Sequence, residues 1–207
     1  MHAAVISIEG PSRATAFARC REVIAAGGII AYPTDTFYGL GADPRNPAAI
    51  KRLFEVKGRA AGQPILLLIH DASEVARWAV NIGTAAEKLM RHYWPGPLTL
   101  VFQARPDVPA ELTAGTGTIG LRVPGHEAAR DLLSAIGSAI TGTSANKSGG
   151  PAARSAADVE ASLGDFLDLI LDGGPSRADK PSTIVDLSGP RPALVRRGAL
   201  EVDFGLF

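Results

Sequence analysis

The chain has 207 residues, of which 46% are hydrophobic and 20% are charged, a composition that suits a folded domain with a substantial core. Its 21 basic residues balance its 21 acidic residues, so the whole protein offers no strong electric field to attract nucleic acid. A single cysteine, Cys20, cannot form an internal disulfide, and the sequence shows neither a signal sequence nor a long apolar span. We therefore expect a cytoplasmic protein.

We expect residues 1–207 to form one domain, because no linker or internal repeat divides them. The apolar pattern predicts strands at residues 5–8, 29–31, 65–69, 98–102, 118–123, 139–141, 169–171, 183–187 and 193–196. It predicts helices between Ser12 and Gly27, between Asn46 and Gly58, and at residues 71–78, 84–92, 126–136 and 155–163. This order favours an α/β fold, with one large twisted mixed β-sheet flanked by helices.

The segment 27–69 holds the most unusual chemistry of the chain. The apolar run 29–31 ends at Pro33, and the predicted loop 33–41 brings hydroxyls, a carboxylate and glycines directly after a strand. Open α/β sheets usually bind ligands at such places. The next helix is predicted to begin after Asn46 and to end at Gly58, with Lys57 and Arg59 beside its end. Cations at that end also complement the helix dipole in the absence of any ligand.

Two common kinds of site are not supported by the sequence. Three glycines at positions 115, 117 and 120 satisfy G-x-G-x-x-G, but a strand is predicted after them, whereas a dinucleotide site needs a helix there. The histidines, at positions 2, 70, 92 and 126, have no metal-ligand spacing. We predict no metal site built by the protein alone.

The remaining motifs resemble those of the threonylcarbamoyl-AMP synthase family, also called the YrdC/Sua5 family. The family pattern runs P-T-[ED]-T-h-Y-G-L-G, where h is apolar, then K-x-R and later S-x-N. The matching stretches are residues 33–41, Lys57-Gly58-Arg59 and Ser144-Ala145-Asn146, in the family order. The resemblance covers residues 16–200 and implies a YrdC-like α/β fold in its minimal, single-domain form.

The resemblance also implies an activity, that of a nucleotidyltransferase. Such an enzyme makes threonylcarbamoyl-AMP from L-threonine, bicarbonate and ATP, and it releases pyrophosphate. Its product serves N6-threonylcarbamoyladenosine (t6A) formation in tRNA, so tRNA or the proteins of a t6A transferase complex are possible downstream partners. Mg²⁺ is expected to arrive with ATP and not in a protein cage. Because a carbamate is already an anionic nucleophile, fixed cations and hydrogen-bond donors would supply most of the catalysis.

The same resemblance assigns roles to individual residues. Lys57 and Arg59 would be the catalytic cations that contact the ATP phosphates. The other expected nucleotide contacts are Thr118, Ser144, Asn146 and Arg196. The expected L-threonine contacts are Thr34, Arg122, Gly142 and Ser182. Each of these residues also has a purely structural interpretation, as a turn hydroxyl, a loop residue or a solvated strand end.

Two other functions remain open on sequence alone. An RNA-binding module would use the same cations without chemistry, although the balanced charge and the lack of an aromatic stacking motif disfavour it. A paralogue that adenylates a different carbamate would share the motifs, because specificity rests on the shape of a pocket. The sequence departs from the family pattern at Leu68, where some relatives have histidine, and at Arg197, where relatives often have proline.

Overall fold

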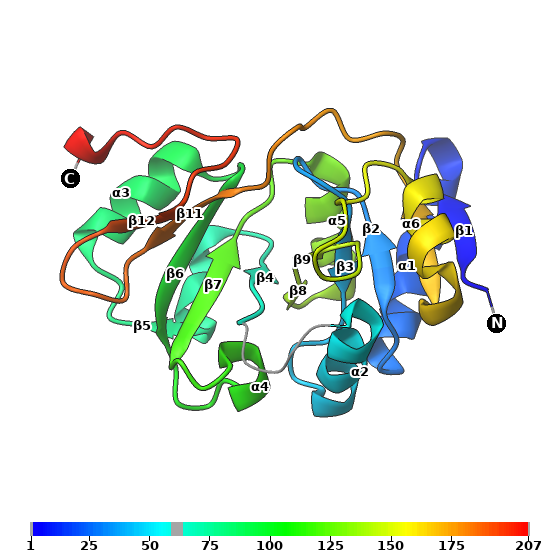
Figure 1. Ribbon diagram of the computed structural model, residues 1–207, viewed down its shortest axis with the longest axis horizontal. Coiled ribbons are helices and arrows are strands. Elements are labelled where there is room, and N and C mark those ends of the chain that lie inside the picture. Colours follow the sequence, from blue (N-terminus) through cyan, green and yellow to red (C-terminus); the bar gives the residue numbers. More distant parts are fainter. Residues whose placement is uncertain (1, 59–63, 207) are drawn as a thin grey trace.

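The computed structural model describes residues 2–58 and 64–206, and its strands form two mixed sheets (Figure 1). The first sheet has the order β1 (Ala4–Ser7), β10 (Leu169–Asp172), β2 (Ile30–Tyr32), β3 (Gly39–Gly41) and β9 (Thr143–Ser144). The second has the order β12 (Ala193–Arg196), β11 (Thr183–Asp186), β6 (Leu98–Ala104), β7 (Thr118–Arg122), β4 (Leu67–Leu68) and β8 (Ile140–Thr141), and β5 (Ala79–Val80) pairs with β6. The α/β class with mixed, helix-flanked sheets is confirmed, but the strands divide between two sheets where one large sheet was expected.

The helices lie around the two sheets (Figure 1). The α-helices are α1 (Arg13–Ala25), α2 (Pro47–Lys57), α3 (Thr84–Tyr93), α4 (Ala110–Thr113), α5 (Glu127–Ile136) and α6 (Ala156–Leu163). Short 3-10 helices are η1 (Gly10–Ser12), η2 (Ala72–Arg77), η3 (Gly164–Phe166) and η4 (Phe204–Leu206). None of the helices within the described residues has the length and apolar character needed to cross a membrane.

Both faces of β2 are buried, as its run of apolar residues requires. Ile30 belongs to a cluster with Phe17 and Cys20 of α1, while Ala31 belongs to a second cluster with Val159 of α6. Successive side chains of a strand point to opposite faces, so α1 and α6 cover opposite faces of the first sheet. This double burial explains why the strand carries no alternating polar residues.

The chain passes from one sheet to the other at Gly142. Thr141 pairs with Leu67 in the second sheet, and Ser144 pairs with Gly39 in the first. Between them, the Gly142 amide donates to the Leu66 carbonyl at 2.8 Å. A Cβ at Gly142 would lie 2.6 Å from Leu66 Cδ1 and 2.9 Å from Leu68 Cγ, so a side chain at the crossing would have to displace these leucines.

The helix predicted between Asn46 and Gly58 is confirmed in detail. The Asn46 side chain accepts hydrogen bonds from the amides of Ala48 and Ala49, and Gly58 ends α2 in the left-handed conformation, with φ of +54°. These contacts satisfy groups that every helix end leaves unpaired. The local signals were sufficient here because each acts over only a few residues.

Several local predictions are corrected by the structure. Ser12 precedes α1 but does not cap it, because its hydroxyl donates to the carbonyls of Ser7 and Glu9. The predicted loop 33–41 ends in strand β3, which pairs antiparallel with β2. The helix predicted at 71–78 is the 3-10 helix η2, at residues 72–77. The strand predicted at 65–69 is limited to β4, at residues 67–68. Tertiary pairing decides the extent of β3 and β4, since strands of two or three residues are too short for a periodic pattern to set their ends.

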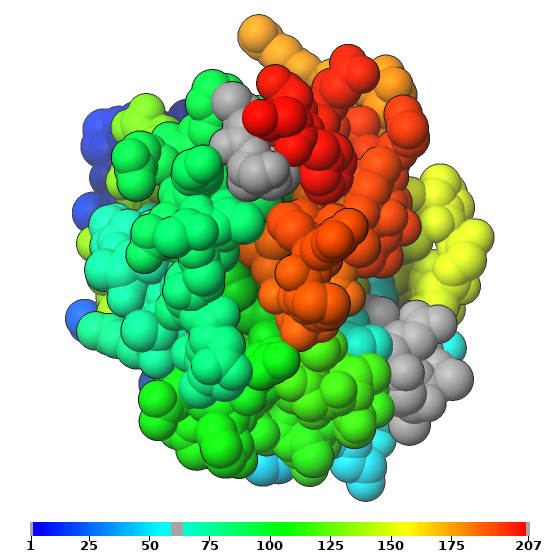
Figure 2. Space-filling model, turned by 90° about the vertical axis from the view of Figure 1, so that its left-hand side faces the viewer, coloured from blue at the N-terminus to red at the C-terminus, as the bar shows by residue number. Residues whose placement is uncertain are grey.

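The segment after β12 packs back onto the second sheet and α3, where Figure 2 shows it in red over the green surface. The Thr183 hydroxyl donates to the Leu200 carbonyl, and the Asp203 amide donates to the Tyr93 hydroxyl at 3.0 Å. These contacts hold the segment after β12 against β11 and α3.

Candidate functional site

A cavity of about 720 Å³ is lined by residues of both sheets and includes the crossing at Gly142. Nine of the ten site residues predicted from the sequence line this cavity: Thr34, Lys57, Thr118, Arg122, Gly142, Ser144, Asn146, Ser182 and Arg196. The tenth, Arg59, lies outside the described residues. The structure thus brings together residues that are separated by up to 162 positions in the sequence, from Thr34 to Arg196.

The two central strands of the second sheet present one face to the cavity. Thr118, Gly120 and Arg122 of β7 all line it, and so do Thr99 and Val101 of β6. Residues two apart on a strand share a face, which explains the spacing of the G-T-I-G-L-R block. Of the three glycines that suggested a dinucleotide motif, only Gly120 lies in β7, and Gly115 and Gly117 precede the strand in the left-handed conformation.

Lys57 is buried, with 4% of its surface exposed, at the C-terminal end of α2. Its Nζ donates to the carbonyl oxygens of Ser144 and Asn146, at 2.5 and 3.0 Å. Its own carbonyl accepts from the Ser148 amide at 2.8 Å. A buried ammonium needs such partners to offset its lost hydration, and the same contacts hold the loop after β9 against α2.

The Ser144-Ala145-Asn146 segment is held by its own hydrogen bonds. Ser144 Oγ donates to Asn146 Oδ1 at 2.5 Å, and Asn146 Nδ2 donates to the Gly150 carbonyl at 2.7 Å. The asparagine therefore fixes both the serine hydroxyl and the turn that follows. This explains the pairing of a serine and an asparagine two positions apart.

Arg122 is 4% exposed and joins β7 to the loop after β2. Its Nη2 donates to Asp35 Oδ1 at 2.5 Å, its Nη1 to Thr36 Oγ1 at 3.1 Å, and its Nε to the Gly96 carbonyl at 3.0 Å. Thr34 Oγ1 lies 3.1 Å from Thr36 Oγ1 and donates to the Phe37 carbonyl. The hydroxyls of the Pro-Thr-Asp-Thr block thus form one network with the arginine.

Ser182 and Arg196 line another part of the cavity and are joined to each other. Arg196 donates through Nε and Nη2 to the Ser182 carbonyl, at 3.1 and 2.9 Å, and Nη2 lies 3.1 Å from Ser182 Oγ. The same hydroxyl lies 2.9 Å from Thr99 Oγ1, and both hydroxyls are buried. A guanidinium held at two nitrogens is oriented by the chain and needs little ordering when a ligand binds.

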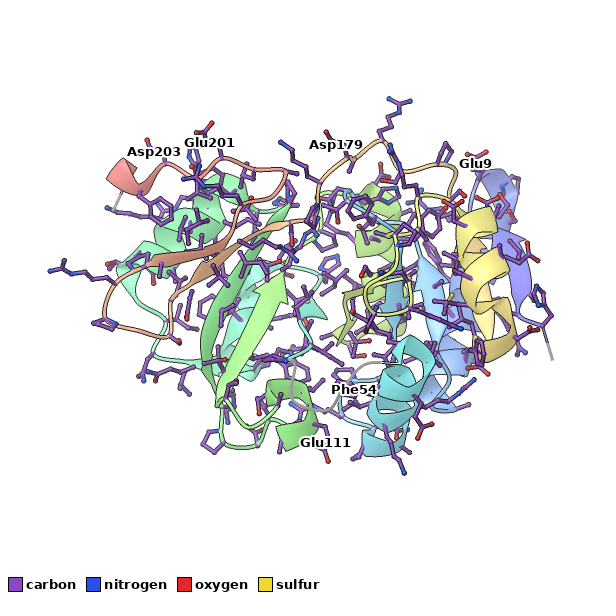
Figure 3. The ribbon with its side chains drawn as sticks, in the orientation of Figure 1. Glu9, Phe54, Glu111, Asp179, Glu201 and Asp203 are labelled. Atoms are coloured by element: carbon purple, nitrogen blue, oxygen red, sulfur yellow. The ribbon has the colours of Figure 1, made fainter. Side chains whose placement is uncertain are left out.

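The lining is cationic. Lys57, Arg122 and Arg196 belong to it, whereas no Asp or Glu within the described residues does. The carboxylates that Figure 3 labels lie toward the outside of the molecule: Glu9, Glu111, Asp179, Glu201 and Asp203. Partial burial, and then the charge of Arg122, lower the pKa of Arg196, as expected when two cations share a space of low polarity. The site is therefore suited to bind anions.

Three polar residues of this site were not assigned to it from the sequence. Asp35 and Thr36 were considered only as part of a loop, and Thr99 was read as part of an apolar strand. A threonine inside the run Leu-Thr-Leu-Val-Phe is a signal in itself, because a hydroxyl in a buried strand needs a partner. Its partner, Ser182, is 83 residues away and cannot be inferred from local sequence.

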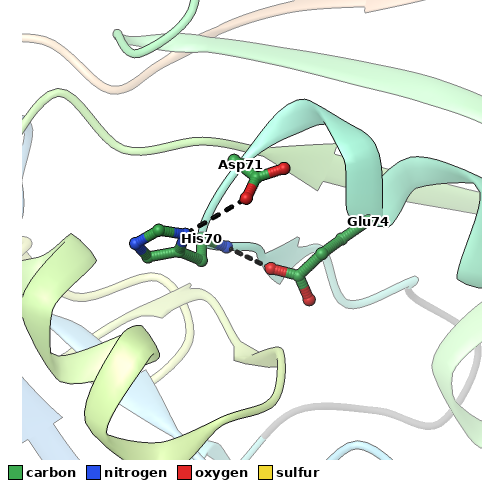
Figure 4. Close-up of side chains that lie close together, drawn as sticks. All are labelled: His70, Asp71 and Glu74. Atoms are coloured by element: carbon green, nitrogen blue, oxygen red, sulfur yellow. Dashed lines mark hydrogen bonds and ion pairs between the residues drawn. The ribbon is translucent and has the colours of Figure 1, made fainter.

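His70, Asp71 and Glu74 form a group of possible metal ligands away from the cavity (Figure 4). Their donor atoms lie within 4.8 Å of one another, although their spacing suggested no such site. Asp71 accepts from the Ser73 amide, Glu74 accepts from the His70 amide, and His70 Nδ1 lies 3.2 Å from Asp71 Oδ2. These contacts stabilise the start of η2 and account for the grouping.

The comparison with protein families decides the classification. The Sua5, YciO and YrdC family model, described as "Telomere recombination", matches residues 22–198. The chain belongs to this family. Threonylcarbamoyl-AMP synthase of Thiobacillus denitrificans is 41% identical over 162 residues, which cover 78% of this chain and 86% of that protein. Threonylcarbamoyl-AMP synthase of Pyrococcus abyssi is 39% identical over 180 residues, 87% of this chain and 53% of that protein.

A solved structure of this family has the same fold. P. abyssi Sua5 complexed with L-threonine superposes with a TM-score of 0.92 at 36% identity, and the match covers 95% of this chain and 58% of that one. The chain therefore spans about half the length of the P. abyssi relative and most of the T. denitrificans relative.

Proposed function

We propose that this chain is a nucleotidyltransferase that makes threonylcarbamoyl-AMP from L-threonine, bicarbonate and ATP. The observation that carries the proposal is the cavity between the sheets, where Lys57, Arg122 and Arg196 line one space with a set of hydroxyls. The family relatives named as threonylcarbamoyl-AMP synthases support the same reaction. A cavity of about 720 Å³ lies within the range typical of small-molecule and cofactor sites.

The reaction makes one bond at nitrogen and one at phosphorus. The threonine amine attacks CO2, which is supplied by bicarbonate, and loses a proton to give a carbamate. A carbamate oxygen then attacks the α-phosphorus of ATP, and the bond to the pyrophosphate oxygen breaks with its electron pair. The products are threonylcarbamoyl-AMP, pyrophosphate and water.

The main obstacle to this reaction is electrostatic, because two anionic groups must approach a triphosphate. Fixed donors that face the developing charge lower this barrier, since they need no reorganisation as the reaction proceeds. We assign Arg122, Thr34, Gly142 and Ser182 to L-threonine. We assign Lys57, Thr118, Ser144, Asn146 and Arg196 to ATP, together with Arg59. Mg²⁺ would enter as part of the MgATP substrate, which suits a described lining that has no carboxylate.

The product is a mixed anhydride and has to be consumed by an acyl transfer to a nucleophilic amine. We propose that this amine is the N6 group of an adenosine in tRNA, so that the partners of this chain are tRNA or the proteins of a t6A transferase complex.

The test is pyrophosphate release by the purified protein with ATP, Mg²⁺ and bicarbonate. L-threonine is compared with L-serine, glycine and no amino acid. We expect turnover with L-threonine and little with the others. Turnover with a different amino acid would indicate a paralogue with another carbamate. No turnover with any amino acid, together with tight RNA binding that weakens steeply with salt, would replace the enzyme by an RNA-binding function.

A further inference from the structure

Asp35 lies in the Pro-Thr-Asp-Thr block but does not line the cavity. Its side chain is 16% exposed and points to Arg122, whose Nη2 donates to Oδ1 at 2.5 Å. The partner is 87 residues away, so the carboxylate serves a tertiary contact in addition to its place in a turn. This pair joins the loop after β2 in the first sheet to β7 in the second sheet.

The hydrogen bonds of Arg122 leave part of its guanidinium for a ligand. A guanidinium carries five N–H donors. The Gly96 carbonyl accepts the N–H of Nε, Thr36 accepts one N–H of Nη1, and Asp35 accepts one N–H of Nη2. One N–H therefore remains on each terminal nitrogen, and Arg122 lines the cavity. Two donors on neighbouring nitrogens match the two oxygens of a carboxylate.

The second carboxylate oxygen of Asp35 lies in an unfavourable environment. Asp35 Oδ2 is buried without a hydrogen-bond partner among the described residues. A Cβ at Gly125 would lie 2.8 Å from it, so the neighbouring segment leaves only enough room for the carboxylate. A buried oxygen without a partner reduces stability, and an orphaned group of this kind calls for an explanation beyond folding. Thr36 and Gly96 already hold the arginine by two neutral contacts.

We propose that Asp35 is a positioning residue that fixes the plane of the Arg122 guanidinium, so that its two remaining N–H groups face a carboxylate in the cavity. The proposal rests on the proposed function for the identity of that carboxylate, which is the one of the amino-acid substrate. Asp35 also balances the charge of Arg122, which shares the cavity with Arg196 and Lys57. Without Asp35, the guanidinium would lose its only charged acceptor among the described residues and would be held only by its neutral contacts to Thr36 and Gly96.

The test measures binding of L-threonine by calorimetry to the wild-type protein and to Asp35→Asn. Asparagine keeps the shape but removes the charge. We expect the dissociation constant for L-threonine to rise roughly 10- to 100-fold, because small displacements of an oriented group have effects of this size. L-threoninol, which lacks the carboxylate, should bind both proteins with equal affinity. Asp107→Asn, an exposed carboxylate paired with Arg105, is the matched control and should leave L-threonine binding unchanged.

A double-mutant cycle separates positioning from a structural role. If Asp35 acts through Arg122, Asp35→Asn should weaken L-threonine binding less than about twofold when Arg122 is already lysine. Equal losses in both backgrounds, or an equal loss for L-threoninol, would overturn the proposal. So would unchanged L-threonine binding by Asp35→Asn, or no L-threonine binding by the wild-type protein. Pyrophosphate release is measured in parallel, and a protein that binds L-threonine in the expected way but releases none would contradict the proposed reaction alone.

Discussion

At the scale of single residues, Lys57 places a positive charge at the cavity and also holds one loop of the cavity wall in place. Its ammonium is buried and donates to two carbonyls of the loop after β9, while its backbone carbonyl accepts from Ser148 in the same loop. The residue therefore organises the segment that carries Ser144 and Asn146. The family resemblance assigned it to the ATP phosphates, and that assignment stays a prediction.

We expect Lys57→Ala to lower pyrophosphate release by at least about 100-fold, because it removes a fixed positive charge from a site that must stabilise anions. The measurement is kcat and KM with MgATP and L-threonine under the conditions given above. Lys51→Ala is the matched control, since Lys51 is an exposed lysine on the same helix. A Lys57→Ala protein that retains more than a third of the wild-type rate would contradict the assignment.

At the scale of elements, the crossing between β8 and β9 determines where the cavity lies. The chain leaves the second sheet at Thr141 and enters the first at Thr143, so one residue spans the change of sheet. The Gly142 amide donates a hydrogen bond to the Leu66 carbonyl. The side chains of Leu66 and Leu68 occupy the space that a side chain at position 142 would need. Leu68 stands where some relatives have histidine, and its position beside Gly142 places an apolar group at the cavity wall.

We expect Gly142→Ala to reduce the free energy of unfolding by about 1–3 kcal/mol, because its Cβ would come within 2.9 Å of Leu68 Cγ. The displaced leucines would also enter the cavity and weaken substrate binding. Urea denaturation measures the stability, and the pyrophosphate assay measures the KM for L-threonine. Gly189→Ala, which meets nothing within 4 Å, should change stability by less than about 0.5 kcal/mol. Equal stability of the two variants would show that the crossing tolerates a side chain.

At the scale of the whole molecule, charged groups from several elements act on one histidine, His126. His126 precedes α5, and its Nδ1 is buried without a hydrogen-bond partner among the described residues. Burial lowers its pKa below 6.5, although the charge of Asp35 opposes this change. Arg13 and Arg130 also lower the pKa of His126, and Glu127 raises it. His126 therefore binds a proton less readily in the folded protein than in the unfolded chain.

This difference predicts a pH dependence of stability. Below about pH 6.5 the unfolded chain gains a proton on His126 while the folded protein does not, so the free energy of unfolding should fall as pH falls from 7.5 to 5.5. His126→Asn should show a smaller fall in urea denaturation at the two pH values. The pKa of His2 is raised by its hydrogen bond to Asp165, so His2 acts in the opposite direction in both proteins and cancels in the comparison. An equal fall in wild type and variant would show that His126 does not contribute.

Some of the protein follows from the sequence by itself. The cap at Asn46, the stop at Gly58, the strand Thr118–Arg122 and the order of helices and strands depend on signals that act within a few residues. The resemblance also brought together candidate site residues that the fold places around one cavity. The helices and strands could be predicted because local backbone preference and the spacing of apolar residues do not depend on distant partners.

Other features were decided only by the tertiary structure. The division into two sheets depends on strands of two or three residues, whose pairing is set by distant neighbours. The contacts between Asp35 and Arg122, and between Thr99 and Ser182, span 87 and 83 residues. A side chain's hydrogen-bond partner is fixed by where the backbone passes in space, and no local pattern records that path. The sequence therefore determined which polar residues are available, and the tertiary structure determined which of them line the cavity and which hold another residue in place.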